Sequence, residues 1–352
     1  MADIKKSKLV IFLIGSTLLI TFTFYGYQIV FTPNILVDRD DRVFFVKKGA
    51  TFHTVQQDLY RANFVNDPVS FSFLARWMDY DKSIKPGRFL LKRNMTNLQA
   101  IRVLRAGVQV PVDITFNNVR LVSELGEKIT RNTSITPEEF DEALENFVAN
   151  NQEGFTRDNV IGMFIPNTYE VYYNLSGEEL IARMLGEYKK FWNETRVAKA
   201  KALGLTPFEV STLASIVQAE NTRGDEAPTI AGLYINRLKK DMPLQADPTL
   251  VFAVGDFTLK RVLNEHKQVD SPYNTYRHAG LPPGPINMPE IHSIDAVLDY
   301  EKHNYLYMCA KEDFSGRHNF ARTLSEHNQN ARKYQRALTI EQQKARAAKR
   351  SK

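Results

Sequence analysis

The chain has 352 residues, a formal net charge of +6 and one cysteine. This length exceeds the size at which one hydrophobic core is usual, so we expect two or three folded units. The single cysteine excludes an internal disulfide and a multi-cysteine zinc site. Basic residues are scattered except between Lys344 and Lys352, so the positive charge does not indicate a nucleic-acid partner.

The N-terminus predicts a membrane anchor. Lys5, Lys6 and Lys8 precede an uncharged, mainly apolar run from Leu9 to Phe31, which is long enough to cross a bilayer as a helix. A cleaved signal peptide would have a shorter apolar region ending in small residues, so we predict an uncleaved span at 9–31. The lysine cluster favours a cytoplasmic tail at 1–8. Basic residues after the span weaken this orientation argument: Arg39, Arg42, Lys47 and Lys48.

The next segment, 41–107, predicts a small α/β module. Its hydrophobic patterns and its Gly and Pro positions indicate, in order, a strand at 43–46, helices at 52–62 and 68–78, and a strand at 88–92. Such a unit resembles the LysM-like module of wall-associated proteins. A packing-only role and glycan binding are about equally compatible with it.

Residues 108–338 predict a helix-rich α+β domain, followed by a basic tail at 339–352. A strand is predicted at 110–116. Four helix starts carry a hydroxyl residue followed three positions later by Glu, an arrangement in which each side chain satisfies a free backbone amide of the first turn. These starts follow Thr136, Ser176, Thr206 and Thr323. Cys309 lies in the apolar run 305–310, which predicts a strand with a buried structural thiol.

The helix that starts after Thr206 is expected to run to about Asn221. It places Val210, Leu213, Ile216 and Val217 on one apolar stripe, and Glu220 falls within about 20° of Leu213. A carboxyl group on an apolar face has a raised pKa, so it can hold a proton near neutral pH and donate it to a leaving oxygen. The alternatives are that the helix frays before Glu220 or that Arg223 or Arg237 pairs with it.

Three stretches downstream are rich in polar residues and are stiffened by Pro and Gly. The intervening donors and acceptors suit the hydroxyls and amides of sugars, and surface turns are the plainer alternative. These stretches are Met242–Thr249, Ser271–Arg277 and Gly280–Asn287, and Asn236-Arg-Leu precedes them.

Four motifs together resemble the endolytic murein transglycosylase family, also called the YceG-like family. They are Ala214-Ser-Ile-Val-Gln-Ala-Glu220, Leu244-Gln-Ala-Asp-Pro-Thr249, Ser271-Pro-Tyr-Asn-Thr-Tyr276 and Gly280-Leu-Pro-Pro-Gly-Pro285. The resemblance extends through Phe164-Ile-Pro-Asn-Thr-Tyr-Glu170, Gly316-Arg-His318 and Glu326-His-Asn328. With the anchor and the LysM-like unit, it covers nearly the whole chain.

This resemblance implies cleavage of the β-1,4 bond between N-acetylmuramic acid and N-acetylglucosamine inside glycan strands, leaving 1,6-anhydro ends. Glu220 matches the single catalytic glutamate, which would act first as acid and then as base, so no second carboxylate is required. We assign substrate positioning and support of the acid to residues of the polar stretches: Asn236, Gln245, Asp247, Thr249, Ser271, Tyr273, Asn274 and Tyr276.

Two positions depart from the family pattern. Gln218-Ala219 replaces a pair that is often charged, and we expect it to lie far around the helix from Glu220. Asn117-Asn118 stands where the family often has Glu-Gly, at the module junction. Neither departure alters the proposed acid.

Seven histidines show no pair with a supporting carboxylate at metal-ligand spacing, so we predict no metal and no cofactor. His318 is the one we expect nearest the site, with a structural role as the default.

The combined prediction is a single-pass protein of the bacterial inner membrane with an α+β fold: a transmembrane helix, a LysM-like module and a catalytic domain on the periplasmic, cell-wall side. Its partners would be glycan strands of peptidoglycan, the lipid bilayer and peptidoglycan synthases such as penicillin-binding proteins. Two alternatives remain open, namely a non-catalytic scaffold that binds peptidoglycan, and a hydrolytic muramidase.

Overall fold

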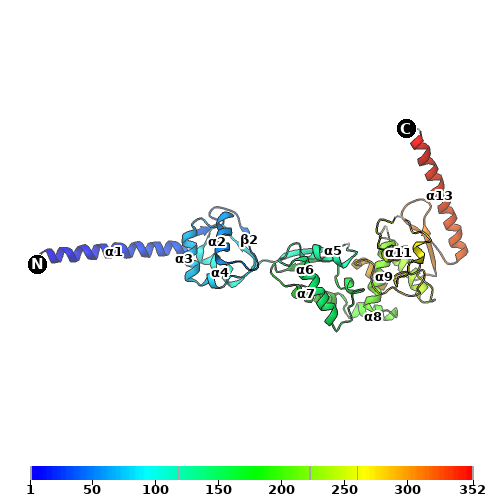
Figure 1. The fold of residues 1–352 in the computed structure, drawn as a ribbon, viewed down its shortest axis with the longest axis horizontal. Coiled ribbons are helices and arrows are strands. Elements are labelled where there is room, and N and C mark those ends of the chain that lie inside the picture. Colours follow the sequence, from blue (N-terminus) through cyan, green and yellow to red (C-terminus); the bar gives the residue numbers. More distant parts are fainter. Residues whose placement is uncertain (1, 118, 222, 260, 351–352) are drawn as a thin grey trace. The chain divides into compact units, whose positions relative to one another are not determined.

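The computed structural model describes residues 2–117, 119–221, 223–259 and 261–350 (Figure 1). Asn118, in the predicted module junction, lies outside them. Within the described residues the chain has thirteen α-helices and four two-stranded sheets, so the predicted α+β class is confirmed. The chain divides into two compact units. Unit 1 holds the described residues up to Ile114 with Thr130–Ile135 and Tyr169–Ser176, and unit 2 holds Thr115–Ile129, Thr136–Thr168 and the described residues from Gly177 onward.

Unit 1 begins with helix α1 (Ala2–Phe31). Its segment Ser7–Phe31 is 25 residues long and apolar enough to cross a bilayer, and its large apolar side chains are mostly exposed. Near the end of the helix, Ile29 is buried in the core of unit 1, and the side-chain amide of Asn97 donates to the Ile29 carbonyl at 3.0 Å. The end of α1 is thereby joined to the folded part of unit 1.

The rest of unit 1 follows the predicted order of strand, two helices and strand. β2 pairs with β3 in antiparallel register, with Phe44 opposite Phe89, and both rings are buried. The predicted bounds were correct to within one or two residues. The elements are β1 (Pro33–Ile35), β2 (Arg42–Val46), α2 (Phe52–Arg61), α3 (Pro68–Trp77), β3 (Gly87–Leu91), β4 (Met95–Thr96) and α4 (Asn97–Ala106).

The boundary between the units falls within two strands, β5 (Val112–Phe116) and β6 (Asn167–Val171). These two strands pair with each other. Unit 2 is mostly helical. Its helices are α5 (Val122–Thr130), α6 (Pro137–Asn150), α7 (Gly177–Phe191), α8 (Glu194–Ala202), α9 (Pro207–Glu220), α10 (Ala227–Leu238), α11 (Asp247–Val254), α12 (Ile291–Leu298) and α13 (Leu324–Arg350). Strands β7 (Tyr307–Ala310) and β8 (His318–Ala321) form an antiparallel hairpin that packs against α13.

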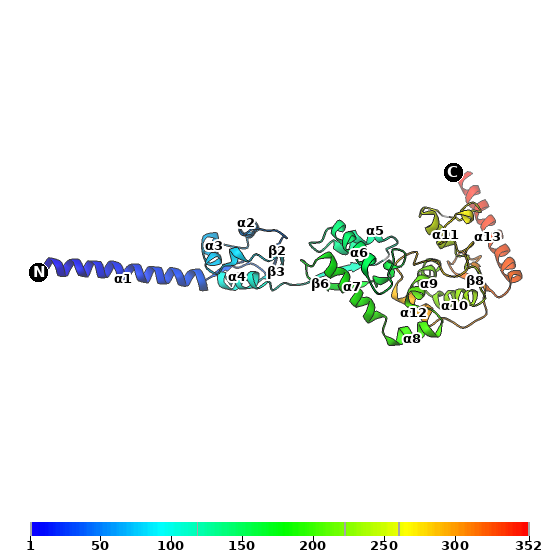
Figure 2. The same ribbon diagram turned by 60° about the horizontal axis from the view of Figure 1, so that its bottom comes forward.

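Helix α9 is the central helix of unit 2. It packs against α10 and α12, which lie beside it (Figure 2), and also against α8 and α11. The predicted stripe of Val210, Leu213, Ile216 and Val217 is buried, but so is every other residue from 210 to 217. The four residues were predicted correctly, but a single stripe was too narrow a description, because neighbours cover this part of α9 on all sides and the hydroxyls of Thr212 and Ser215 bond within the protein.

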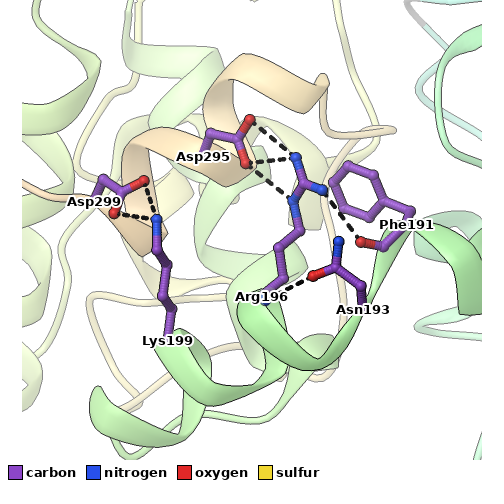
Figure 3. Close-up of polar contacts among 6 residues, drawn as sticks. All are labelled: Phe191, Asn193, Arg196, Lys199, Asp295 and Asp299. Carbon is purple, nitrogen blue, oxygen red and sulfur yellow. Dashed lines mark hydrogen bonds and ion pairs between the residues drawn. The ribbon is translucent and has the colours of Figure 1, made fainter.

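Two ion pairs join α8 to α12 on the outside of this helix packing (Figure 3). Arg196 Nη2 lies 3.1 and 3.3 Å from the two carboxylate oxygens of Asp295, and its guanidinium also lies over the Phe191 ring. Lys199 Nζ lies 2.6 Å from Oδ1 of Asp299. Because α12 packs on α9, these pairs support the helix that carries Glu220.

Cys309 lies on β7, as predicted, but its side chain is only partly buried. The prediction of a buried thiol was wrong, because a two-stranded hairpin has too few neighbours to enclose every strand residue. Burial, followed by the charge of Glu312, raises the pKa of this thiol, so the unreactive thiol form is favoured.

Candidate active site

Glu220 is the last residue of α9, and the helix start fixes its position. The Thr206 hydroxyl accepts from the backbone amide of Glu209, while the Glu209 carboxylate accepts from the amide of Thr206 at 2.7 Å. The helix continues to Glu220 and is closed by the Asn221 amide, which donates to the Val217 carbonyl at 3.0 Å. The alternative in which the helix frays before Glu220 is therefore wrong.

The Glu220 carboxyl group is enclosed by protein, although its side chain keeps some exposure to a cavity. Burial, followed by the nearby charge of Asp247, raises the pKa of Glu220 from 4.5 to about 7. A hydrogen bond from Tyr234 opposes both effects. Near neutral pH this group can therefore be either protonated or charged, as a residue that serves as both acid and base requires.

Tyr234 comes from α10, which packs beside α9. Its phenolic hydroxyl donates to Oε1 of Glu220 at 3.2 Å, and the side chain is buried. Burial, with the adjacent Glu220, raises the pKa of Tyr234 well above 10, so the phenol remains a donor. Sequence reasoning missed this residue. Its only local signal is its position two residues before Asn236-Arg237 on a helix with an otherwise apolar face.

Neither of the two arginines considered as partners of Glu220 forms an ion pair with it within the described ranges. Arg223 Nε donates to the Ser315 carbonyl at 2.5 Å. Arg237 donates to the carbonyls of Leu306, Pro243 and Leu244 at 2.7–3.0 Å. Both cations are engaged by backbone oxygens, which leaves the raised pKa of Glu220 uncompensated by positive charge.

Asp247 is the second carboxylate of the site. It is the first residue of α11, where the free amides of a helix start favour a negative charge. Its Oδ1 accepts from the Tyr276 hydroxyl at 2.6 Å. Burial and this bond to Asp247 raise the pKa of Tyr276 well above its usual value. Asp247 is thus held in place by a phenol, as Glu220 is.

Glu220 and Asp247 open into one cavity of about 900 Å³, near the upper end of the size range of small-molecule sites. Five segments of unit 2 line it. They are the end of α9 (Gln218, Ala219, Glu220), α11 with the loop after it (Asp247, Pro248, Val251, Phe252, Phe257, Leu259, Arg261, Val262), the loop before α12 (Ile286, Asn287), the start of α5 with the segment that leads into it (Arg120, Glu124), and α13 (Tyr334, Gln335, Leu338).

The pair Gln218-Ala219 also lines this cavity, although the two residues were predicted to lie far around the helix from Glu220. The helix ends at Glu220, and its last turn is open to the cavity on more than one side. Gln218 is held there by the Glu290 amide, which donates to its side-chain oxygen at 2.6 Å.

Most of the other predicted substrate residues hold the loops together. The side-chain amide of Asn274 donates to the carbonyls of Lys267 and Val269, and its oxygen accepts from the Tyr276 amide. Thr249 Oγ1 contacts the Thr275 hydroxyl at 2.8 Å. Asn274 and Thr249 are both fully buried, so the structure places them behind the cavity wall and in support of Asp247 and Tyr276.

The remaining predicted residues lie off the cavity as well. Ser271 Oγ accepts from the Tyr273 amide, and the Tyr273 ring packs on Phe252, a cavity residue, at 4.7 Å between centroids. Gln245 is exposed and accepts from Arg237 at 3.3 Å. Asn236 donates to the carbonyls of His303 and Tyr305. Among the eight predicted positions, only Asp247 lines the cavity.

His318, expected nearest the site among the histidines, is also off the cavity. Its Nδ1 lies 3.0 Å from Oε2 of Glu226, and its backbone amide donates to the same carboxylate. This contact ties β8 to the segment that enters α10. The structure therefore places His318 in the structural role that was the default.

The comparisons with known proteins agree with the resemblance read from the motifs. A family model described as the YceG-like family matches residues 44–333. A Bacillus subtilis protein named endolytic murein transglycosylase is 30% identical over 268 residues, which cover 75% of this chain and 72% of that protein.

A Streptococcus pneumoniae protein of the same name is 24% identical over 358 aligned residues, which cover 92% of this chain. This chain spans 64% of the length of that relative. Among solved structures, a YceG-like protein from Listeria monocytogenes has a TM-score of 0.50 and 25% identity, covering 82% of this chain and 98% of that one.

Proposed function

Because this chain belongs to the YceG-like family, we propose that it is an endolytic peptidoglycan lytic transglycosylase with Glu220 as its acid and base. The observation that carries the proposal is the enclosed Glu220 carboxyl group, with a pKa of about 7, at a cavity large enough for a glycan segment. The names of the B. subtilis and S. pneumoniae relatives support the reaction class.

In the first step, protonated Glu220 donates its proton to the glycosidic oxygen between N-acetylmuramic acid and N-acetylglucosamine. The bond from the anomeric carbon to that oxygen breaks, and N-acetylglucosamine leaves as an alcohol. Positive charge develops at the anomeric carbon, where the nearby Asp247 carboxylate stabilises it electrostatically. The Tyr234 hydroxyl holds the carboxyl group of Glu220 and stabilises the anion that remains.

In the second step, the Glu220 carboxylate removes the proton from the C6 hydroxyl of the same N-acetylmuramic acid. The C6 oxygen then bonds to the anomeric carbon, which closes the 1,6-anhydro ring and restores the protonated acid. Water does not enter the product. One group performs both transfers, which suits a pKa near the working pH.

The proposal extends to the rest of the chain. α1 would anchor the enzyme in the inner membrane with residues 1–8 in the cytoplasm and unit 2 on the cell-wall side, next to nascent glycan and the synthases that make it. The order of strand, two helices and antiparallel strand in 41–107 supports a LysM-like module. Residues 108–338 would form the catalytic domain, followed by the basic tail at 339–352.

The direct test is mass spectrometry of the products that the full-length protein releases from peptidoglycan, comparing wild type with Glu220→Gln. We expect products ending in 1,6-anhydro-N-acetylmuramic acid from wild type and none from the variant. The substitution keeps the size of the side chain but removes its acid–base chemistry, so loss of products would not be a packing effect.

A hydrolytic muramidase is the second candidate function, and Asp247 is the observation that supports it. A hydrolase needs a second carboxylate near the scissile bond, and Asp247 shares the cavity with Glu220. Its products would be one water heavier and would carry reducing ends. Release of such products would replace the transglycosylase proposal. No release by either protein, on mature or nascent glycan, would favour a peptidoglycan-binding scaffold.

A further inference from the structure

Helix α13 supplies one wall of the cavity that contains Glu220, through Tyr334, Gln335 and Leu338. Tyr334 and Leu338 are four residues apart and therefore lie on the same face of the helix. The family model ends at residue 333, so this wall lies just beyond the region that the family match covers.

The Tyr334 ring is held by a second aromatic residue from the β7–β8 hairpin. Phe314 lies 5.8 Å from it between ring centroids, at a tilt of 60°. Phe314 is 46% exposed and has a φ of +53°, an uncommon backbone conformation for a residue with a bulky side chain. Because Phe314 is exposed and is held in this conformation beside a cavity residue, we infer that it serves the surface around Tyr334 rather than the hydrophobic core.

The position of α13 is fixed well enough to present this wall. Its first turn is capped reciprocally, since the Glu326 amide donates to the Thr323 hydroxyl and the Thr323 amide donates to the Glu326 carboxylate. The helix then packs on β7 and β8. Side chains 334, 337 and 338 are partly buried, whereas those from 339 to 346 are exposed. The cavity residues thus lie at the end of the packed part of the helix.

We propose that Tyr334, braced by Phe314 and continued by Leu338, is an aromatic platform that binds a sugar ring of the glycan strand at a distance from the reacting bond. Sugar rings present faces of C–H groups, which pack on aromatic faces, and the Gln335 amide supplies a donor and an acceptor for hydroxyl or N-acetyl groups. The platform determines which strands bind well. This inference rests on the proposed function, because it takes glycan as the ligand.

The test measures binding separately from cleavage. Full-length protein carrying Glu220→Gln, held in detergent micelles, is titrated into fluorescently labelled, uncross-linked glycan strands, and the dissociation constant is read from anisotropy. Adding Tyr334→Leu should weaken binding about five- to tenfold, while Tyr334→Phe, which keeps the ring, should bind nearly as well as the parent. Gln329→Leu, on an exposed position about 140° around α13, is the matched control and should bind unchanged.

Cleavage by proteins with intact Glu220 gives the second measurement. Tyr334→Leu should raise KM about five- to tenfold and leave kcat near wild type, because the platform does not touch the reacting atoms. Equal binding by the Tyr334→Leu and parent proteins would overturn the platform and leave the proposed function intact. Failure of the Glu220→Gln parent itself to bind any strand would instead overturn the glycan substrate on which both proposals depend.

Discussion

The phenol of Tyr234 on α10 donates to the carboxyl group of Glu220 on α9, at 3.2 Å. This bond favours the charged form of Glu220 and lowers its pKa, against burial and the charge of Asp247, which raise it. The acid is therefore set between opposing influences that come from two other helices. The hydrogen bond and the charge of Asp247 can each be removed by a substitution that preserves side-chain shape.

Tyr234→Phe removes the hydrogen bond and retains the ring. The pKa of Glu220 should rise above about 7, so the alkaline limb of the pH profile of kcat/KM should move to higher pH. We expect kcat to fall about tenfold, because the Glu220 anion formed in the first step loses a donor. Tyr276→Phe is the comparison, since that phenol bonds Asp247 and not Glu220.

Asp247→Asn should move the same limb in the opposite direction. Removing the negative charge takes away an influence that raises the pKa of Glu220, so the acid should deprotonate at lower pH. Above the new pKa, each unit of downward shift should cost about tenfold in the protonated fraction and in kcat/KM. Shifts in the same direction for Asp247→Asn and Tyr234→Phe would contradict this account of the site.

The raised pKa of Glu220 also predicts how stability depends on pH. Because its folded pKa of about 7 exceeds its ordinary 4.5, the folded state holds a proton that the unfolded state has lost between these values. Wild type should therefore lose about 2 kcal/mol of unfolding free energy as pH rises from 4.5 to 8, after allowance for the partial exposure of the side chain.

The Glu220→Gln variant has no ionisable group at position 220. It should therefore lack this loss of unfolding free energy and be more stable than wild type at pH 8. Urea unfolding of both proteins at several pH values measures the difference. Glu142→Gln, on the exposed side of α6, serves as the control and should follow wild type. An unfolding free energy of Glu220→Gln that runs parallel to wild type across this range would rule out the raised pKa.

The α8–α12 contacts in Figure 3 predict unequal effects of two substitutions. Arg196→Ala removes a two-pronged ion pair with Asp295 and the packing of its guanidinium on Phe191, so it should destabilise unit 2 by about 1–2 kcal/mol. Lys199→Ala removes a more exposed pair with Asp299 and should cost less than about 0.5 kcal/mol. Thermal unfolding compares them, and equal costs would show that the Arg196 contacts add nothing to a surface ion pair.

The sequence by itself determined the elements whose signals are local. A hydroxyl residue and a glutamate three positions apart predicted the start of α9 at Thr206, and the structure has both hydrogen bonds of that cap. The strands and helices of 41–107 were predicted with similar accuracy, since turn residues and hydrophobic periodicity act over a few residues. The helix register then placed Glu220 at the end of α9.

Only the tertiary structure decided what surrounds Glu220. Tyr234 reaches the carboxyl group because α10 packs beside α9, and no spacing along the chain encodes that contact. The polar loops were predicted as substrate contacts, yet fully buried Thr249 and Asn274 bond to their own loop segments. Polar groups that face a ligand and those that satisfy buried backbone have the same composition, so the sequence alone cannot separate them.

The sequence also does not show that α13 forms a wall of the cavity. Tyr334 lies 114 positions beyond Glu220 in the sequence, yet both line one cavity. Helix periodicity marks Tyr334 and Leu338 as sharing a face, but not which surface that face meets. That depends on how the capped start of α13 and the β7–β8 hairpin direct the helix, and on side-chain packing that exists only in the folded chain.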